Sequence, residues 1–277
     1  MKLIADSGST RTTWQVSDCS ILMKEHSTTG INPFYQTEEE IAQLVSEQLA
    51  PAMGEYSIDE IYFYGAGCAF DDKKKMVANA LRASFSEARI LVESDLLGAA
   101  RGLFGHENGI ACIMGTGSNS CEYDGNTIIK NVSPLGFILG DEGSGAVLGK
   151  LFIGDCLKNQ LPEWLREKFM DEYELTPATI LDRVYKKPFP NRFLASFTPF
   201  LFAHLEEPAI FNLVYDAFDA FIVRNLLQYN TAELPIGFIG SIAWYFRDVL
   251  EIAAAEHQLT ISTIRQNPVE GLVAFHG

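Results

Sequence analysis

Basic residues are scarce in this sequence. Its 277 residues include 21 Lys and Arg against 36 Asp and Glu, which gives a formal net charge of -15 at pH 7. Sequence-independent binding to nucleic acid or to an anionic membrane needs clustered Lys and Arg, so we expect neither partner. A small anionic ligand such as a nucleotide remains compatible, because backbone N–H groups and a bound cation can hold phosphates without many basic side chains.

Cysteines are few and scattered, and long apolar runs are absent. The five cysteines are Cys19, Cys68, Cys112, Cys121 and Cys156. They form no C-x-x-C pair, which disfavours a zinc knuckle and a disulfide framework and fits thiols in a reducing compartment. No apolar run reaches membrane-spanning length, and Met1 leads directly into a strand-like segment without the regions of a signal peptide. These features predict a cytoplasmic protein.

The first hundred residues predict one compact α/β domain. Three strand-like runs, LIAD, TTWQV and ILMKEHS, follow one another closely, as in an antiparallel meander. A capping box at Thr37 and Glu40 then opens a helix. Strand IYFYG, helix DDKKKMVANALRASF, strand RILVE and helix LLGAARGLF follow as a β-α-β-α alternation. We expect a first domain over residues 1–106.

The same pattern begins again near Gly109 with GIACIMGTGSNSCEYDGNTIIKNV, which predicts three further strands. The segments IADSGSTRTTWQV and CIMGTGSNSCEY align as strand, small-residue turn and strand, which suggests an internal duplication. Helical periodicity dominates residues 141–232, and LPIGFIGSIAWYFRDVL predicts a strand, Gly-Ser and a helix. We expect a second domain over residues 107–277, and two alternatives stay open for its last segment: it packs within this domain or back on the first one. That segment lacks the run of small residues that would let a last helix pack closely.

Two hairpin tips of this kind, facing each other across a cleft, would present several N–H groups and hydroxyls to one polyphosphate. An actin-like nucleotide-binding site is built in this way. The alternative is that the two segments are structural turns, because Gly, Ser and Asp are also ordinary turn residues. Two other phosphate-binding motifs, the P-loop and the dinucleotide fingerprint, do not match the sequence. SGAVLGKL lacks the first Gly and the final Ser or Thr of a P-loop, and GTGSNS lacks the third Gly of a dinucleotide fingerprint.

Five motifs occur in order along nearly the whole chain. They are D-x-G-x-T at 6–10, S-D-x-x-G-A at 94–99, G-T-G-S-N at 115–119, G-D-E-G-S at 140–144 and G-S at 240–241. The set resembles N-acetylglucosamine kinases and their relatives in the BadF/BadG/BcrA/BcrD ATPase family. The resemblance implies two actin-like (ribonuclease-H-like) α/β domains flanking a nucleotide and sugar cleft. It also implies ATP-dependent phosphorylation of an amino sugar, most simply N-acetylglucosamine at its 6-hydroxyl, with ATP and Mg²⁺ as cofactors.

Phosphoryl transfer needs positioned phosphates, a divalent metal and a carboxylate that accepts the alcohol proton. Asp95 follows a strand and begins a helix, so it is the candidate base and a sugar contact; its alternative is a plain helix N-cap. Asp6, beside the first hairpin tip, is the candidate Mg²⁺ ligand. The resemblance assigns the nucleotide to residues of three small-residue turns, which are Ser9, Thr10, Gly115, Thr116, Gly117, Gly240 and Ser241.

The remaining candidates are sugar contacts that the resemblance implies, besides Asp95. They are Asn32, Ser118, Asn119, Gly136 and Asp141. Asn32 is otherwise a turn former, and Asp141 otherwise an N-cap. Leu135 stands where the family has an aromatic residue, so we expect altered recognition of the N-acetyl group.

Two rival functions remain open at this point. One is an ATPase that activates an electron-transfer partner, which would need cysteines placed to share an iron–sulfur cluster. Only Cys68 lies near a suitable loop. The other is a non-catalytic sugar or nucleotide sensor, which has no need to keep both Asp6 and Asp95. A homodimer is also left open.

Overall fold

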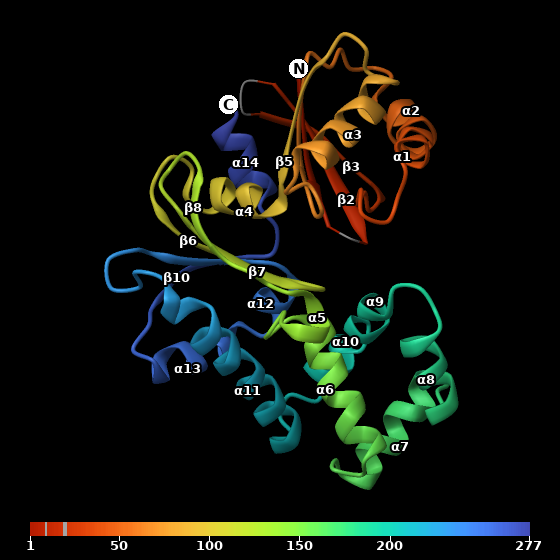
Figure 1. The fold of residues 1–277 in the computed structure, drawn as a ribbon, viewed down its shortest axis with the longest axis vertical. Coiled ribbons are helices and arrows are strands. Elements are labelled where there is room, and N and C mark those ends of the chain that lie inside the picture. Colours follow the sequence, from red (N-terminus) through yellow and green to blue (C-terminus); the bar gives the residue numbers. More distant parts are fainter. Residues whose placement is uncertain (9, 19–20) are drawn as a thin grey trace. The chain divides into compact units, whose positions relative to one another are not determined.

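The computed structural model describes residues 1–8, 10–18 and 21–277, and it contains two five-stranded sheets with helices around them (Figure 1). The chain divides into two compact units. The first consists of Met1–Ala111, Cys121–Lys130 and Asn267–Gly277, and the second of Cys112–Ser120 and Asn131–Gln266.

The first sheet has the strand order β3-β2-β1-β4-β5. Its strands are β1 (Lys2–Ser7), β2 (Arg11–Asp18), β3 (Ile21–Thr29), β4 (Glu60–Gly65) and β5 (Arg89–Ser94). The meander β1-β2-β3 is antiparallel, as predicted, whereas β4 and β5 lie parallel to β1. The register aligns Ser7 with Gly65 and Gly65 with Ser94, so β1, β4 and β5 end at the same edge of the sheet.

Helices cover both faces of the first sheet. They are α1 (Glu38–Leu44), the π-helical turn η1 (Val45–Leu49), α2 (Ala50–Met53), α3 (Asp71–Arg82), α4 (Asp95–Phe104) and α14 (Val269–Phe275). α1 and α3 lie on one face, and α4 and α14 on the other (Figure 1). Because both faces are covered, β1 has three consecutive buried apolar residues, Leu3, Ile4 and Ala5, as strands buried on both faces do. The predicted capping box is confirmed: Glu40 N–H donates to Thr37 Oγ1 over 3.3 Å, and Thr37 N–H donates to the Glu40 carboxylate over 2.8 Å.

The last helix, α14, packs closely on α4 through glycine. A Cβ added to Gly271 would overlap the carbonyl oxygen of Gly102, and one added to Gly102 would overlap Pro268. The two helices therefore approach backbone to backbone at this point. The expectation that this segment cannot pack closely is wrong, because one glycine on each helix is sufficient and no run of small residues is needed.

The second sheet has the order β10-β9-β6-β7-β8. Its strands are β6 (Gly109–Met114), β7 (Ser118–Tyr123), β8 (Ile128–Val132), β9 (Ile236–Ile239) and β10 (Ile261–Arg265). In both sheets the central strand is the first in the sequence, with the second and third strands on one side and the fourth and fifth on the other. The repeated order confirms the internal duplication. β10, which pairs in parallel with β9, was not anticipated from the sequence.

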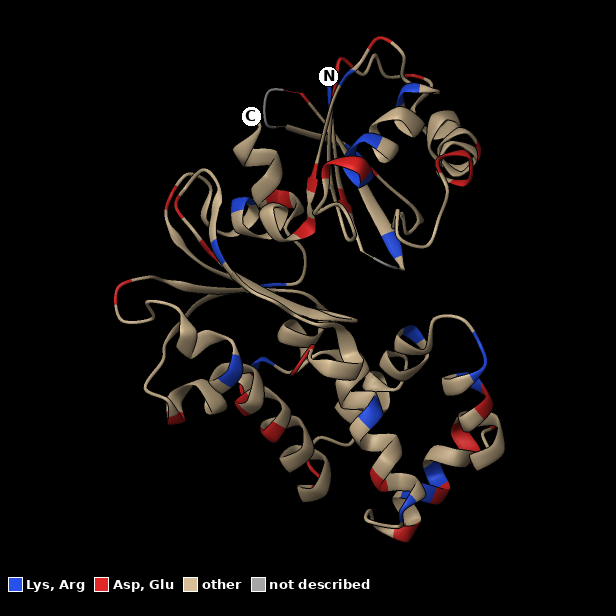
Figure 2. Ribbon diagram, viewed as in Figure 1, with Lys and Arg blue, Asp and Glu red and all other residues tan. Residues whose placement is uncertain are grey.

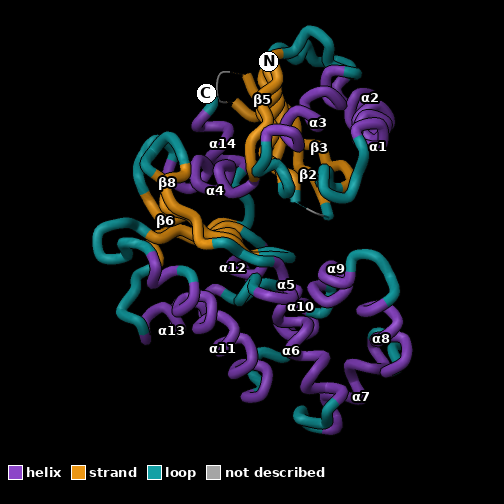
Figure 3. Tube along the Cα trace, viewed as in Figure 1, coloured by secondary structure: helices purple, strands orange, loops and turns teal. Residues whose placement is uncertain are grey.

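Helices make up most of the remaining second unit (Figure 3). They are α5 (Gly136–Leu139), α6 (Gly145–Leu157), α7 (Glu163–Glu172), α8 (Pro177–Tyr185), α9 (Pro190–Ala195), α10 (Thr198–Ala203), α11 (Pro208–Arg224), the 3₁₀ turn η2 (Leu226–Gln228), α12 (Ser241–Tyr245) and α13 (Arg247–Glu256). The helical periodicity of residues 141–232 is thus confirmed. Lys and Arg are interspersed with the more numerous Asp and Glu in both units (Figure 2). Within the described ranges, every helix is too short or too polar to cross a membrane.

Candidate functional site

Asp6 and Asp95 lie at the edge where the three parallel strands of the first sheet end. Asp6 is the penultimate residue of β1, and Asp95 follows Ser94, which aligns with Ser7 across β4. Two strand spacings separate β1 from β5, or about 10 Å. Side chains alternate along a strand, so Asp6 points to the same face as Ile4, the face that α14 covers. Ligands of open α/β sheets bind at this kind of edge.

The helix that starts at Asp95 is capped by another residue. Ser94 is the N-cap of α4, and its hydroxyl accepts the Leu97 N–H over 3.2 Å. Asp95 is the first residue of the helix, and its Oδ1 accepts the Leu96 N–H over 2.9 Å. Since Ser94 performs the capping, the plain N-cap interpretation of Asp95 is wrong, and its carboxylate has a second oxygen for other partners.

Both carboxylates have raised pKa values. Burial raises the pKa of Asp95 to about 6, against hydrogen bonds from the Leu96 and Asp95 backbone that lower it. Burial, and then the negative charge of Asp95, raise the pKa of Asp6 to about 7. Two carboxylates that oppose each other's ionisation favour a cation beside them, and perturbed groups of this kind are common at functional sites.

Asn32 lies near the same edge of the first sheet. The Ser7 hydroxyl donates to the carbonyl of Ile31 over 3.0 Å, which ties this loop to the end of β1. Asn32 is 6% exposed, its Oδ1 accepts the Phe34 N–H over 3.0 Å, and a Cβ on Gly67 would touch it. The side-chain oxygen of Asn32 thus forms a turn, which is the alternative role that the sequence left open for this residue. The Nδ2 group is not used in any of these contacts.

The tip of the first hairpin is partly described. Gly8 N–H donates to the Arg11 carbonyl over 3.0 Å, and Gly30 N–H donates to the Thr10 carbonyl over 3.0 Å. The Thr10 residue is exposed, so its hydroxyl is accessible at the tip. Ser9, also predicted to bind the nucleotide, lies outside the described residues.

The other predicted nucleotide residues come together in the second unit. The β6–β7 turn closes with a 2.9 Å hydrogen bond from Gly115 N–H to the Gly117 carbonyl. Gly240 has φ +127°, and a Cβ there would overlap the Met114 carbonyl next to this turn. Ser241 follows directly and begins α12. The glycine at position 240 therefore lets the end of β9 approach the β6–β7 turn, so that two of the motifs assigned to the nucleotide lie next to each other.

The first turn of α6 also docks on this tip. Gly145 N–H donates to the Gly115 carbonyl over 2.8 Å, and Ala146 N–H donates to the Thr116 carbonyl over 3.1 Å. The Thr116 carbonyl is thereby occupied, and its side chain is partly exposed. The tip is held by protein contacts and does not need a ligand to define its backbone.

The predicted sugar residues of the second unit fall into two groups. Ser118 and Asp141 are neighbours, because the Ser118 N–H bonds the Asp141 carboxylate. The Ser118 hydroxyl donates to the Glu142 carbonyl over 2.8 Å, so its role is structural in this arrangement. Asn119 Oδ1 accepts from its own neighbour Ser120 N–H over 2.9 Å and from Asn131 Nδ2 over 3.0 Å.

Asp141 closes a short loop that also contains Gly136. Asp141 N–H donates to the Pro134 carbonyl over 2.9 Å, and Gly136 has φ +74° at the exposed start of α5. Burial, followed by the charge of Glu142, raises the pKa of Asp141 to about 6, against the Ser118 N–H and Lys150. The N-cap interpretation of Asp141 is wrong, since Ser144 caps α6 and its hydroxyl accepts the Val147 N–H over 3.3 Å.

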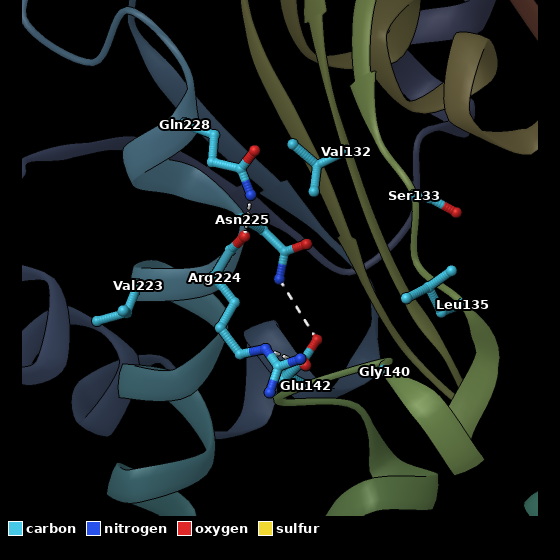
Figure 4. Close-up of a pocket in the computed structure, with 9 residues that line it drawn as sticks. All are labelled: Val132, Ser133, Leu135, Gly140, Glu142, Val223, Arg224, Asn225 and Gln228. Atoms are coloured by element: carbon cyan, nitrogen blue, oxygen red, sulfur yellow. Dashed lines mark hydrogen bonds and ion pairs between the residues drawn. The ribbon is translucent and has the colours of Figure 1, made fainter.

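A pocket of about 350 Å³ lies beside the loop that contains Asp141, and sequence reasoning missed it. Leu135, Gly140 and Glu142 line it from the loop, and Arg224 and Asn225 line it from the end of α11 (Figure 4). Arg224 and Asn225 belong to no motif, and they are more than 80 residues from Glu142. A sequence-based signal could have come only from the charge of Glu142, which needs a partner when buried.

The cysteines give no support to an iron–sulfur cluster. Cys68 is fully buried, and burial raises the pKa of its thiol to about 12, so it remains protonated at neutral pH. In the described part of the chain, no three His, Cys, Asp or Glu side chains are grouped so that they could hold a metal ion. The buried, protonated Cys68 thus lends no support to the rival function of activating an electron-transfer partner.

The fold and sequence match a solved structure over the whole chain. A candidate N-acetylglucosamine kinase from Porphyromonas gingivalis is 52% identical, with 100% of this chain and 98% of that chain covered and a TM-score of 0.97. The chain belongs to the N-acetylglucosamine kinase-like family of actin-like ATPases. The resemblance inferred from the five motifs is thus confirmed.

More distant structures share the fold of this family. A candidate N-acetylglucosamine kinase from Chromobacterium violaceum is 16% identical, with 100% and 98% of the two chains covered and a TM-score of 0.74. A ROK family glucokinase from Streptomyces griseus, in complex with glucose and AMPPNP, is 13% identical, with 99% and 97% covered and a TM-score of 0.61. The chain matches no protein-family model and no curated protein.

Proposed function

We propose that this protein transfers the γ-phosphoryl group of ATP to an amino sugar, N-acetylglucosamine in the first place, at its 6-hydroxyl. The observation that carries the proposal is the 52% identity over full length with a candidate N-acetylglucosamine kinase. A carboxylate with a raised pKa at the end of a parallel strand supplies the chemistry that such a reaction requires.

Asp95 is proposed as the general base. Its carboxylate would accept the proton of the sugar hydroxyl as that oxygen attacks the γ-phosphorus and the bond to ADP breaks. The pKa of about 6 suits this task, because the group is mostly ionised at pH 7 to 8 and is more basic than an ordinary aspartate.

Asp6 is proposed to hold Mg²⁺, directly or through water. The donor set fits this ion: the ligand is a carboxylate, and the pKa of about 7 reflects burial and the nearby charge of Asp95, which a cation relieves. Magnesium commonly takes one or two carboxylates together with waters and phosphate oxygens, so no larger protein cluster is required. When bound, the ion offsets the charge of the phosphates.

The remaining assignments follow the geometry of the two units taken separately. For the nucleotide we propose Thr10 of the first unit, with Ser9 on sequence grounds alone, and Gly115, Thr116, Gly117, Gly240 and Ser241 of the second. For the sugar we propose Asp95 and Asn32 of the first unit and Ser118, Asn119, Gly136 and Asp141 of the second. Ser118 and Asn119 would have to exchange or share the protein hydrogen bonds that they make.

A substrate panel tests the proposal. The purified protein is incubated with ATP and Mg²⁺ and with N-acetylglucosamine, glucosamine, N-acetylmannosamine or glucose, and ADP release is measured. We expect the highest kcat/KM with N-acetylglucosamine. Leu135 is 59% exposed and offers no aromatic surface, so glucosamine and glucose should compete better than in relatives with an aromatic residue there. Sugar-independent ADP release, or none at all, would contradict the proposal.

Homodimer formation, cytoplasmic location and the lack of binding to nucleic acids and membranes stay predictions. The net charge of -15 supports the last of these.

A further inference from the structure

Glu142, the neighbour of Asp141, is held by the end of α11. Its side chain is 15% exposed, and Oε1 accepts from Arg224 Nε over 2.7 Å. Asn225 Nδ2 lies 3.5 Å from Oε2 and completes the contacts (Figure 4). A side chain that is mostly buried and paired on both oxygens has a defined orientation.

The backbone of Asp141 and Glu142 is fixed by hydrogen bonds within the loop and by one from Ser118 at the start of β7. Asp141 has φ +55°, a left-handed conformation that costs a residue with a side chain about 1–2 kcal/mol. Three hydrogen bonds hold it: Asp141 N–H to the Pro134 carbonyl, Ser144 N–H to the Asp141 carbonyl over 3.0 Å, and the Ser118 hydroxyl to the Glu142 carbonyl. The unfavourable conformation persists because its surroundings over-determine it.

The two partners of the Arg224–Glu142 ion pair differ in exposure, and this difference determines what the loss of either charge would cost. Arg224 is 61% exposed and Glu142 is 15% exposed. An exposed pair contributes little, and loss of the Arg224 charge alone would hardly matter in water. Glu142, however, would be left as a mostly buried carboxylate with one long hydrogen bond, which is strongly unfavourable. The chain can relieve that cost by moving Glu142 outward, and this movement would displace Asp141.

We propose that Glu142, held by Arg224 and Asn225, is a positioning residue that keeps Asp141 in its left-handed conformation and thereby sets the affinity for the sugar. The proposal rests on the proposed function for its sugar, whereas the positioning itself is a property of the loop. Neither Glu142 nor Arg224 needs to touch the substrate.

Kinetics of Arg224→Met test the effect on the sugar. We expect the sugar KM to rise about tenfold with kcat and the ATP KM within about threefold, because the lost interaction acts on sugar binding. Arg224→Lys should recover part of the affinity. Glu142→Gln/Arg224→Met should bind sugar better than Arg224→Met, since no buried charge is left. Lys186→Met, which removes an exposed i,i+4 ion pair on α8, is the matched control and should change nothing.

The pH profile separates positioning from general damage. The charges that act on Asp141 are Glu142, which raises its pKa, and Lys150, which lowers it. Without Arg224 the charge of Glu142 is uncompensated, so the pH below which equilibrium binding of the sugar weakens should move to a higher value. In the double variant it should return to the wild-type position or below.

Amide hydrogen exchange at Asp141 and Ser144 measures the positioning without any substrate. We expect exchange about tenfold faster in Arg224→Met and unchanged in Lys186→Met, because the hydrogen bonds of the loop open more often. Faster exchange in Arg224→Met, together with a wild-type protein that phosphorylates no sugar, would overturn the proposed function and leave the positioning intact. Unchanged exchange in Arg224→Met, or a sugar KM within twofold of wild type in an active enzyme, would overturn the inference.

Discussion

At the scale of single residues, several candidates had two interpretations, and the neighbouring contacts decide between them. Asp95 and Asp141 were each compatible with a helix cap, but Ser94 and Ser144 cap α4 and α6. The carboxylates are therefore available for chemistry. Asn32 differs, because its side-chain oxygen accepts the Phe34 N–H and so does form a turn.

Asp95→Asn is the sharpest test at this scale. The substitution preserves shape and the hydrogen bond from Leu96 N–H, and it removes the proton acceptor. Loss of a general base typically lowers the rate by ~10²–10⁴-fold, so we expect kcat to fall by that factor with both KM values nearly unchanged. Steady-state ADP release measures it. Asp71→Asn is the matched control, since Asp71 is likewise the first residue of a helix but is exposed. A variant that kept more than about a tenth of wild-type kcat would remove Asp95 from this role.

At the scale of elements, glycines decide which segments approach one another. Gly240 brings the end of β9 against the β6–β7 turn, and Gly271 and Gly102 bring α14 against α4. In each case an added Cβ would overlap main-chain atoms, which cannot move as a flexible side chain can. These contacts place the last helix on the first sheet, the sheet that carries Asp6 and Asp95.

Gly271→Ala should destabilise the protein, and Gly154→Ala should not. Both are helical glycines, and alanine is favoured over glycine in a helix by about 1 kcal/mol. At Gly271 the new methyl would overlap the Gly102 carbonyl, and overpacking typically costs about 1–3 kcal/mol. At Gly154 on α6 the methyl meets nothing within 4 Å. Urea unfolding measures the difference. Equal effects of the two substitutions would show that α14 can move away from α4 without cost.

At the scale of the whole molecule, the fold holds carboxylates where they are unfavourable as ions. Asp95 and Asp141 have pKa values of about 6 from burial, in a protein whose net charge is already -15. The folded state binds these protons more tightly than the unfolded state, so stability falls as pH rises from about 4 through 6. The protein is thus less stable at neutral pH than its core alone would make it, and ligands should offset this.

Asp141→Asn should stabilise the ligand-free protein in a pH-dependent way. The variant has no charge to desolvate, so its gain over wild type should be near zero at pH 4 and reach roughly 1–2 kcal/mol at pH 8, allowing for partial exposure. Thermal unfolding at several pH values measures it, and the exposed Asp71→Asn should show no such trend. A gain that is constant with pH would mean that the charge of Asp141 is well solvated.

The sequence alone determined most elements, the repeated hairpins and the family, and it supplied the site candidates, because periodicity, capping and motifs depend on neighbours within a few residues. The capping box at Thr37 and the Gly-Ser after β9 are examples. Only the tertiary structure decided the close packing at Gly271, the pairing of β10 and the partnership of Glu142 with Arg224. Those depend on which surfaces meet after the chain has travelled tens of residues, and a short edge strand or a lone charge has no local pattern that specifies its partner.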